Sequence, residues 1–314
     1  MGLVVVATFA AACGDDGKPD RTVAFLRTSA IAEASQDALL AELEAEGWTV
    51  GDNLTLVAGD VDEVYEDGDA AGAVIDAWVE DGVDLIIALS TPSGLAAKNA
   101  ELDIPVLAIA NDPVASGIVA NPREPDANIT GLSFRVPPDR TLDVARQLGN
   151  DISTVGLLWP ADDMGAEPIR EGIIDAAASL GVDLVDASFV GPEGVADAVG
   201  ALVAGGAQVV VLANASATVR AIPEIEAATT AAGLPVVANI ESNTFAVAIL
   251  APDMVETYRQ VGRQAARLLD GTDVSEVPVE DPGRFRLTLR TAIADQLEID
   301  LPDDLLQQAH EVSD

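Results

Sequence analysis

Short apolar runs alternate with amphipathic segments along most of the chain. Leu85–Leu89 is apolar at every position and is bounded by turn residues, which is typical of a strand buried on both faces. Val106–Ala110 is a second such run, and a short Ala-rich helix is expected between the two. Polar residues follow each run, at Ser90–Gly94 and at Asn111–Pro113. Because open α/β sheets bind ligands beyond the carboxyl ends of their strands, we expect a binding edge here.

The rest of the first half repeats this alternation of strands and helices. Gln36–Glu46 places leucines at helical spacing and stops at a glycine, which is typical of a helix end. The other elements expected here are strands Thr22–Arg27, Leu54–Ala58 and Ile129–Ser133 and the helix Ala70–Glu80.

The pattern of the first half then recurs about 130 residues later. Three segments match a counterpart: TVAFLRTSA with TVGLLWPAD, DGVDLIIALSTPS with GGAQVVVLANASA, and DIPVLAIANDP with GLPVVANIESN. A β-α-β-α-β-α-β order that recurs once predicts two similar α/β domains with parallel sheets. The second copy comprises strands Thr154–Trp159, Val182–Phe189, Val209–Ala213 and Pro235–Asn239 and helices Ile169–Leu180, Val195–Val203 and Ile222–Ala232.

Three expected elements lie outside the repeat, namely Ala246–Leu250, Met254–Leu269 and Phe285–Leu289. They must close the structure, and we expect them to pass back between the two domains.

Composition and charge narrow the range of partners. The 314 residues suffice for two domains, and an aromatic content of 4% beside a hydrophobic content of 49% predicts a core of aliphatic side chains. The net charge of −37 excludes the basic face that nucleic acid binding requires, and an anionic membrane surface would repel the chain. So acidic a chain is expected to be a soluble monomer. The charge fits either a high-salt habitat or simply a solvated acidic surface.

The amino-terminal residues 1–20 are expected to be a signal sequence and linker. An apolar run from Leu3 to Ala12, too short to span a bilayer, precedes Cys13, the one cysteine. Small residues before Cys13 and a polar stretch after it resemble a bacterial lipobox, in which the cysteine is lipidated. The run lacks the basic residues that usually begin such a signal, and Ala10 stands where Leu is usual. A plain cleaved signal and a free buried cysteine are the alternatives.

The hydroxyl residues Thr91 and Ser93 lie between a strand and a helix. Hydroxyls and free N–H groups at such a helix start suit a carboxylate or a phosphate. The alternative is a helix cap without a ligand. Asn214 and Ser216 occupy the mirrored position in the second copy, which favours the ligand-binding interpretation.

A second mirrored pair carries carboxylates, at Asp112 and Glu241. Each could hold an amine or sugar hydroxyls, and each could instead be part of an Asx-capped turn. Thr28 and Ser29 follow the first strand of the first copy, and Trp159 ends the first strand of the second. Trp159 could stack on a ligand ring or belong to the core.

No catalytic or cofactor motif is evident in the sequence. It contains no G-x-S-x-G, no P-loop, no G-x-G-x-x-G and no Cys/His cluster, so no enzyme, cofactor or metal is expected. The one histidine, His310, is expected on the surface of a carboxyl-terminal helix. The acidic pair Asp162 and Asp163 carries little signal in so acidic a chain.

With these residues in view, the chain resembles the substrate-binding proteins of ABC transporters, which have a type I periplasmic-binding fold. The resemblance is closest to the branch that includes tryptophan- and tyrosine-binding lipoproteins. It runs in family order over nearly the whole chain after the signal. The segments that carry it are DLIIALSTPSGLAAKNA, IPVLAIANDPVASGIV, NITGLS, TVGLLW, LPVVAN, YRQVGRQAARLLDG and LEIDLPDDLLQQA.

The resemblance implies two Rossmann-like domains joined by three crossover segments, with the ligand held between them. The first domain would comprise residues 21–135 and 251–276, and the second residues 136–250 and 277–314. Thr28, Ser29, Thr91, Ser93 and Asp112 would line the first side, and Trp159, Asn214, Ser216 and Glu241 the second. Two departures stand out: Trp159 replaces a frequent Tyr, and Ala213–Ala215 replaces the usual Thr-Asp-Asn.

The function implied is a monomeric lipoprotein, anchored through Cys13 to the outer face of the membrane, at the cell surface or in the periplasm. It would capture a small solute, an amino acid or a related carboxylate, and deliver it to an ABC permease. The alternatives are a ligand-sensing module of a receptor and an enzyme that uses the cleft carboxylates. A repressor of this fold is disfavoured because no basic segment precedes Thr22.

Overall fold

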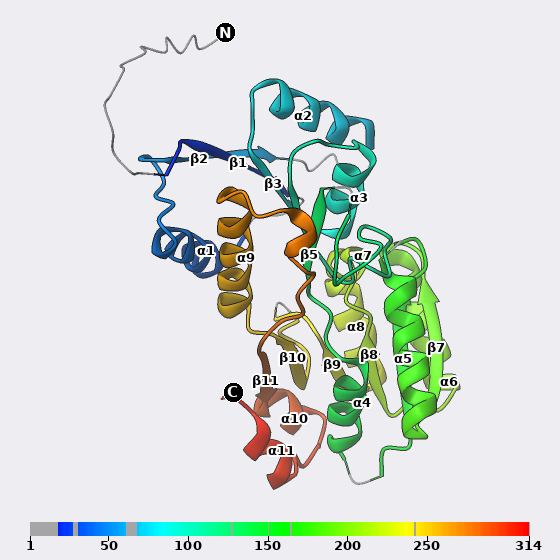
Figure 1. Cartoon of the computed structure of the whole chain (residues 1–314). Coiled ribbons are helices and arrows are strands. Elements are labelled where there is room, and N and C mark those ends of the chain that lie inside the picture. Colours follow the sequence, from blue (N-terminus) through cyan, green and yellow to red (C-terminus); the bar gives the residue numbers. More distant parts are fainter. Residues whose placement is uncertain are drawn as a thin grey trace, which may run out of the picture.

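Two parallel α/β sheets organise the chain in the computed structural model (Figure 1). The structure describes residues 18–27, 31–60, 68–126, 128–149, 151–163, 165–241 and 243–313, with the backbone alone at 59, 60 and 68–70. The expected α/β fold with two parallel-sheet domains is confirmed.

The first sheet has the strand order β2-β1-β3-β4-β5, and all its pairs are parallel. Helices α1 and α9 lie side by side on one face (Figure 1), where leucines of α1 pack with Phe25 and Tyr258. Residues of α2 and α3 pack with Ile86 and Ala108, whose side chains point to the opposite face. The bounds are β1 Arg21–Arg27, α1 Glu33–Ala45, β2 Leu54–Asp60, α2 Gly68–Glu80, β3 Leu85–Leu89, α3 Thr91–Asn99, β4 Val106–Ala110, β5 Ile129–Ser133 and α9 Met254–Leu269.

The second sheet has the order β12-β11-β10-β9-β8-β6-β7, and only the pair β10–β11 is antiparallel among the described strands. Its two hydrophobic clusters lie on opposite faces, around Leu157 and around Leu158. The bounds are α4 Pro138–Gln147, β6 Thr154–Pro160, α5 Ala166–Leu180, β7 Asp183–Phe189, α6 Val195–Ala204, β8 Val209–Leu212, α7 Ser216–Arg220, α8 Ile222–Ala232, β9 Val236–Ala238, β10 Ala248–Pro252, β11 Phe285–Arg290, α10 Thr291–Gln296, α11 Asp303–Gln308 and β12 Glu311–Ser313.

The chain passes between the two sheets three times: after β5, between β10 and α9, and before β11. Strand β10 continues to Pro252, two residues beyond the expected boundary at 250. Glu280 forms a bridge to Leu132 of β5, so residues 277–280 still lie along the first sheet. The third crossing therefore lies at 281–284 rather than at 276/277, because backbone hydrogen bonds to β5 hold the segment that long.

Several elements were missed by the hydrophobic pattern. Helix α4 and the short elements α7, α10 and β12 were not expected. His310 is exposed, as expected, but it follows α11 instead of lying within it. Its backbone N–H donates to the Leu287 carbonyl, and its Nδ1 accepts from the Leu287 N–H, so it extends the edge of the sheet. Cys13 lies outside the described residues.

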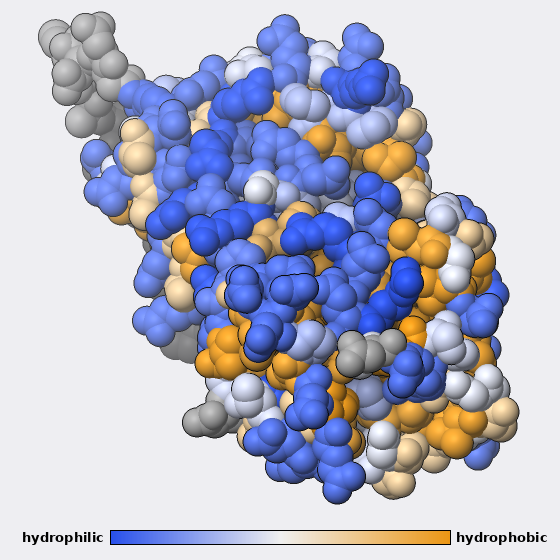
Figure 2. All heavy atoms as spheres, turned by 90° about the horizontal axis from the view of Figure 1, so that it is seen from below, coloured by the Kyte–Doolittle hydropathy of each residue, from blue (hydrophilic) through white to orange (hydrophobic). Residues whose placement is uncertain are grey.

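Figure 2 shows one face on which hydrophilic residues predominate and hydrophobic residues form separate patches. Within the described part of the chain, no helix combines the length and apolar character that a membrane span requires.

Candidate ligand-binding site

The carboxyl ends of strands from the two sheets meet at a direct contact. The Asn111 side chain, which follows β4, donates from Nδ2 to the backbone carbonyl of Asn214, which follows β8, at 2.6 Å. A Cβ atom added at Gly165, in the loop after β6, would lie 3.7 Å from Oγ1 of Thr91 at the start of α3. We call the loops after β3 and β4, together with those after β6, β8 and β9, the facing edges.

Helix α3 begins with a tight cluster of hydroxyls. Ser90 is its N-cap, and its Oγ accepts from the Ser93 N–H at 3.2 Å and donates to Ser93 Oγ at 2.9 Å. Both side chains are buried, Ser93 completely and Thr91 with 7% of its surface exposed, and Thr91 lies against the second unit. The capping alternative therefore describes the Ser90–Ser93 pair, and Thr91 is the hydroxyl that lies at the facing edges. A ligand contact of Ser93 stays a prediction.

Ser90 itself has an unusual backbone, with φ of 149°. Residues other than glycine rarely adopt this conformation, which costs of order 1–3 kcal/mol and concentrates at functional sites. The strain lies at the carboxyl end of β3, directly before Thr91. This strain could not be predicted from the sequence, because Ser is an ordinary N-cap residue.

The Asp112 carboxylate is occupied by its own loop. Its Oδ1 accepts from the N–H groups of Val114 and Ala115, at 3.1 and 2.9 Å, as in an Asx turn. Its Oδ2 lies 3.7 Å from Nη1 of Arg135. Asp112 thus has less capacity for a ligand amine than the sequence pattern suggested, and its ligand role remains a prediction.

On the second side, Asp163 organises the loops that carry the predicted residues. Its Oδ1 accepts from the Gly165 N–H and its Oδ2 from the Ala217 N–H, both at 2.9 Å. It therefore ties the loop after β6 to the start of α7, where Asn214 precedes and Ser216 begins the helix. Sequence analysis gave Asp163 little weight, since acidic pairs are common in this chain.

Trp159 is half-buried at the end of β6. The Arg170 guanidinium carbon lies 5.0 Å from the centre of its ring, and Arg170 also pairs with Asp186. Hydrogen bonding to Asp186 raises the pKa of Arg170. The indole Nε1 is buried without a hydrogen-bond partner among the described residues. One ring face is thus covered by a cation, and stacking of a ligand on Trp159 stays a prediction.

Glu241 follows β9 and has an exposed side chain, but its carboxylate is partly sheltered. Burial raises the pKa of Glu241; Arg286 opposes this shift, and Asp253 and Glu311 add to it. Asp253 in turn caps α9 and lies 3.7 Å from Arg284. The negative charge of Glu241 is therefore only partly balanced by Arg286, because two further carboxylates, Asp253 and Glu311, also act on it.

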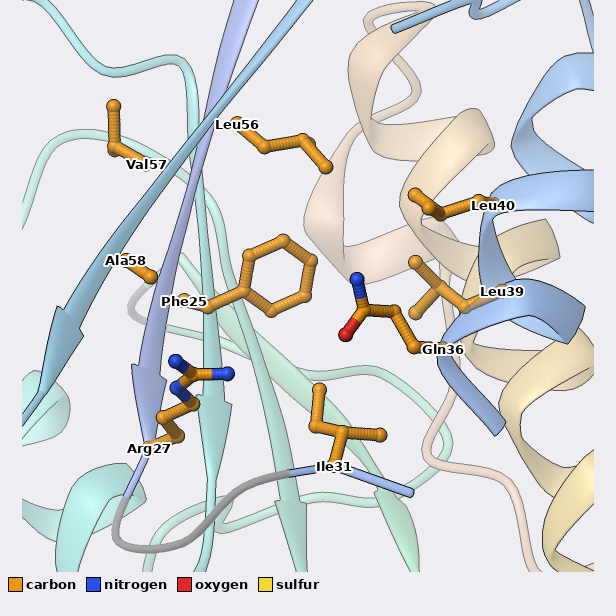
Figure 3. A pocket seen from close by; sticks show the side chains of 9 residues that line it. All are labelled: Phe25, Arg27, Ile31, Gln36, Leu39, Leu40, Leu56, Val57 and Ala58. Atoms are coloured by element: carbon orange, nitrogen blue, oxygen red, sulfur yellow. The ribbon is translucent and has the colours of Figure 1, made fainter. Parts of the chain in front are cut away.

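Three predicted features are not tested by the structure. Thr28 and Ser29 lie outside the described residues, as does Cys13. A separate hollow of about 310 Å³ lies in the first unit (Figure 3), and all its described walls come from β1, β2, α1 and the residue Ile31. This hollow does not bring the two repeats together. Among the described residues, no group of His, Cys, Asp and Glu has the arrangement of a metal site.

Comparisons with known proteins agree with this architecture. The chain is 27% identical over 240 residues to the "Tyrosine-binding protein" of Clostridioides difficile, covering 76% of this chain and 68% of that protein. A conserved domain protein of Vibrio cholerae superposes with a TM-score of 0.81 at 22% identity, covering 94% of this chain and all of that one. An ABC domain from Streptococcus pneumoniae in complex with L-Trp gives 0.79 at 17% identity, with the same coverage.

More distant structures share the fold alone. The Lac repressor superposes with a TM-score of 0.59 at 14% identity, covering 86% of this chain and 81% of that one.

The family described as "ABC transporter substrate binding protein" matches residues 29–313, almost the whole described chain. Members of this family bind solutes outside the cytoplasm and are not enzymes. The chain thus belongs to the ABC transporter substrate-binding protein family.

Proposed function

We propose that this protein is a lipoprotein that captures an α-amino acid between its two α/β units and delivers it to the membrane permease of an ABC transporter. The observation that carries the proposal is the contact of the facing edges at Asn111 and Asn214. A solute held there touches both units at once and so stabilises their closed arrangement.

The two charges of an amino acid find complementary groups at these edges. The Thr91 hydroxyl, at the start of α3, would donate to the carboxylate. Glu241 is a better partner for the ammonium than Asp112, because the Asp112 oxygens already accept from Val114 and Ala115 and face Arg135. Trp159, which also packs against the core of the second unit, would then contact the ligand side chain.

The names of the relatives support this class of ligand. One relative is a tyrosine-binding protein and one solved structure holds L-Trp. Trp159, Asn214 and Ser216 would set the preference for one side chain, since they lie at the carboxyl ends of β6 and β8 in the second unit. Thr28 and Ser29 would complete the first side.

A thermal-shift screen of the full chain against the twenty amino acids tests the proposal. A ligand at 100 times its Kd stabilises the folded state by about 2.7 kcal/mol, which raises the unfolding temperature. For each amino acid that binds, the amine lacking its carboxylate and the acid lacking its amine should bind more weakly. If no amino acid raised the unfolding temperature, the proposed ligand class would be wrong.

Thr91→Val separates the site from general destabilisation. Loss of a hydrogen bond to a charged group costs about 1.5–3 kcal/mol, which is roughly tenfold or more in affinity. Thr55→Val is the matched control. Thr55 is exposed and lies at the amino end of β2, whereas the facing edges lie at the carboxyl ends of other strands. Equal affinities of the two variants would contradict the role of Thr91.

Attachment to the membrane through Cys13 is the second part of the proposal. Its support is the apolar run and the small residues before Cys13. Metabolic labelling with a fatty-acid analogue should label the parent in a bacterial host and leave Cys13→Ser unlabelled. Equal labelling of both would show that Cys13 is not the lipidated residue.

A further inference from the structure

We infer that Asn111 is an interdomain latch, a residue that sets the balance between the open and closed arrangements without touching the ligand. Its side-chain amide donates to the Asn214 carbonyl across the facing edges at 2.6 Å. The two residues are 103 positions apart in sequence and belong to different sheets. This hydrogen bond can exist only when the two units are closed.

The donor side of the latch is fixed to the chain crossings. The backbone carbonyl of Asn111 accepts from Ser133 Oγ at 2.9 Å. Ser133 is buried, its N–H donates to the Glu280 carbonyl at 2.8 Å, and its Oγ also accepts from the Arg135 N–H. Asn111 is thus held by the same residue that joins the end of β5 to Glu280, at the points where the first and the third crossing begin.

The acceptor side is fixed as well. Two hydrogen bonds fix the backbone on either side of Asn214. The Ala213 carbonyl accepts from Thr218 Oγ1 at 2.7 Å, and the Ala217 N–H donates to Asp163. The carbonyl of Asn214 therefore has a defined position within the second unit. A donor and an acceptor, each held rigidly within its own unit, make a contact that depends on the angle between the units.

This geometry predicts what each substitution does. Asn111→Ala removes the donor, and Asn111→Asp places a carboxylate oxygen opposite the Asn214 carbonyl oxygen. Two acceptors at this separation repel, so the aspartate variant should open the protein more than the alanine variant. A residue that acts only on closure changes the affinity for every ligand by one common factor.

Small-angle scattering of the full chain without ligand is the first arm of the test. Asn111→Asp should increase the radius of gyration relative to the parent. Asn121→Asp is the matched control, because Asn121 is exposed in the same unit and introduces the same charge change. It should scatter as the parent does. Equal radii of gyration for Asn111→Asp and the parent would overturn the latch.

Ligand binding is the second arm, and it rests on the proposed function. Asn111→Ala should weaken each amino acid that binds by about fivefold, as loss of one hydrogen bond predicts, mainly through faster dissociation. Factors that differ between ligands would show direct ligand contact and overturn the inference. Should the parent bind no amino acid, the proposed function fails, while the scattering arm still decides on the latch.

Discussion

Asp163 accepts a hydrogen bond from the backbone N–H of Ala217 at 2.9 Å, and this bond joins the loop after β6 to the first turn of α7. The second oxygen of Asp163 holds Gly165, which lies against Thr91 of the opposite unit. One carboxylate thus joins the loops after β6 and β8 on the second side of the facing edges. Its role is positional, because both of its oxygens are engaged by the backbone.

Asp163→Ala should lower both stability and affinity. Loss of a carboxylate that caps backbone N–H groups costs about 1–2 kcal/mol of unfolding free energy. The affinity for the amino acid should fall as well, since Gly165 and Asn214 lose their fixed positions. Asp162→Ala is the control, because Asp162 is exposed and adjacent, and such substitutions change stability by less than about 0.5 kcal/mol. Denaturant unfolding and calorimetric titration measure both effects, and identical behaviour of the two variants would contradict this role.

Amino acid binding should weaken as the pH falls through the raised pKa of Glu241. Burial raises that pKa above the usual value, and a bound ammonium would lower it again, so binding releases a proton. The affinity is therefore full above the raised pKa and is lost below it. Glu241→Gln should bind more weakly and lose this pH dependence. Calorimetric titrations with the amino acid at several values between about pH 4 and 7, which cover the ordinary and the raised pKa of a glutamate, measure this dependence.

The raised pKa of Glu241 affects the stability of the ligand-free fold in the opposite direction: stability falls as the pH rises. The folded state binds the Glu241 proton more tightly than the unfolded state, so ionisation of Glu241 destabilises the fold. Its contribution to stability falls as the pH rises through the raised pKa, and Glu241→Gln should unfold at a higher temperature than the parent at neutral pH. A lower unfolding temperature would show that Glu241 has a stabilising partner.

Gly131 is a position at which a side chain cannot fit. A Cβ atom there would lie 2.2 Å from the Ala108 carbonyl oxygen in the adjacent strand β4. The Gly131 carbonyl also accepts from the Glu280 N–H, which holds the third crossing. Gly131→Ala should cost about 3 kcal/mol of unfolding free energy. Gly200→Ala, in α6 with open space around it, should instead stabilise by about 0.5–1 kcal/mol; the reverse order would contradict the packing.

Added salt should stabilise this protein at neutral pH. A net charge of −37 repels itself in the compact state, and salt screens the repulsion. The unfolding temperature should therefore rise between low salt and about 1 M KCl, where the Debye length is about 3 Å. Near the isoelectric point of about 4.1 the rise should shrink, because few net charges remain. If salt raised the unfolding temperature equally at both pH values, the rise would have a cause other than the screening of net charge.

Most of the fold was predicted from the internal repeat of strands and helices in the sequence. Buried strands such as Leu85–Leu89 and helices that end at glycine, such as Ile222–Ala232, lie where the hydrophobic pattern placed them. Helix α4 was missed because it begins at Pro138 with a polar turn. The third crossing was placed too early because nothing in the sequence of 277–280 signals its hydrogen bonds to β5.

The site was less predictable than the fold for a physical reason. The place of Thr91 and Asn214 at the facing edges was predictable because both follow buried strands, and position along a strand can be read from one sequence; their contact with a ligand stays a prediction. Asn111 and Asp163 act through single hydrogen bonds to backbone groups 103 and 54 residues away. The Asn111 contact depends on how the two units meet, and the Asp163 contact depends on how two loops of the second unit meet; no local pattern encodes either. The engagement of Asp112 by its own loop was open as an alternative, and hydrogen-bond geometry was needed to favour it.

Calorimetric titration of the full chain with single amino acids tests the central claim most directly. Our account predicts saturable binding of at least one amino acid, with one molecule bound per chain, and weaker binding by both Thr91→Val and Glu241→Gln. The absence of saturable heat with every amino acid, from a chain that unfolds cooperatively, would contradict it.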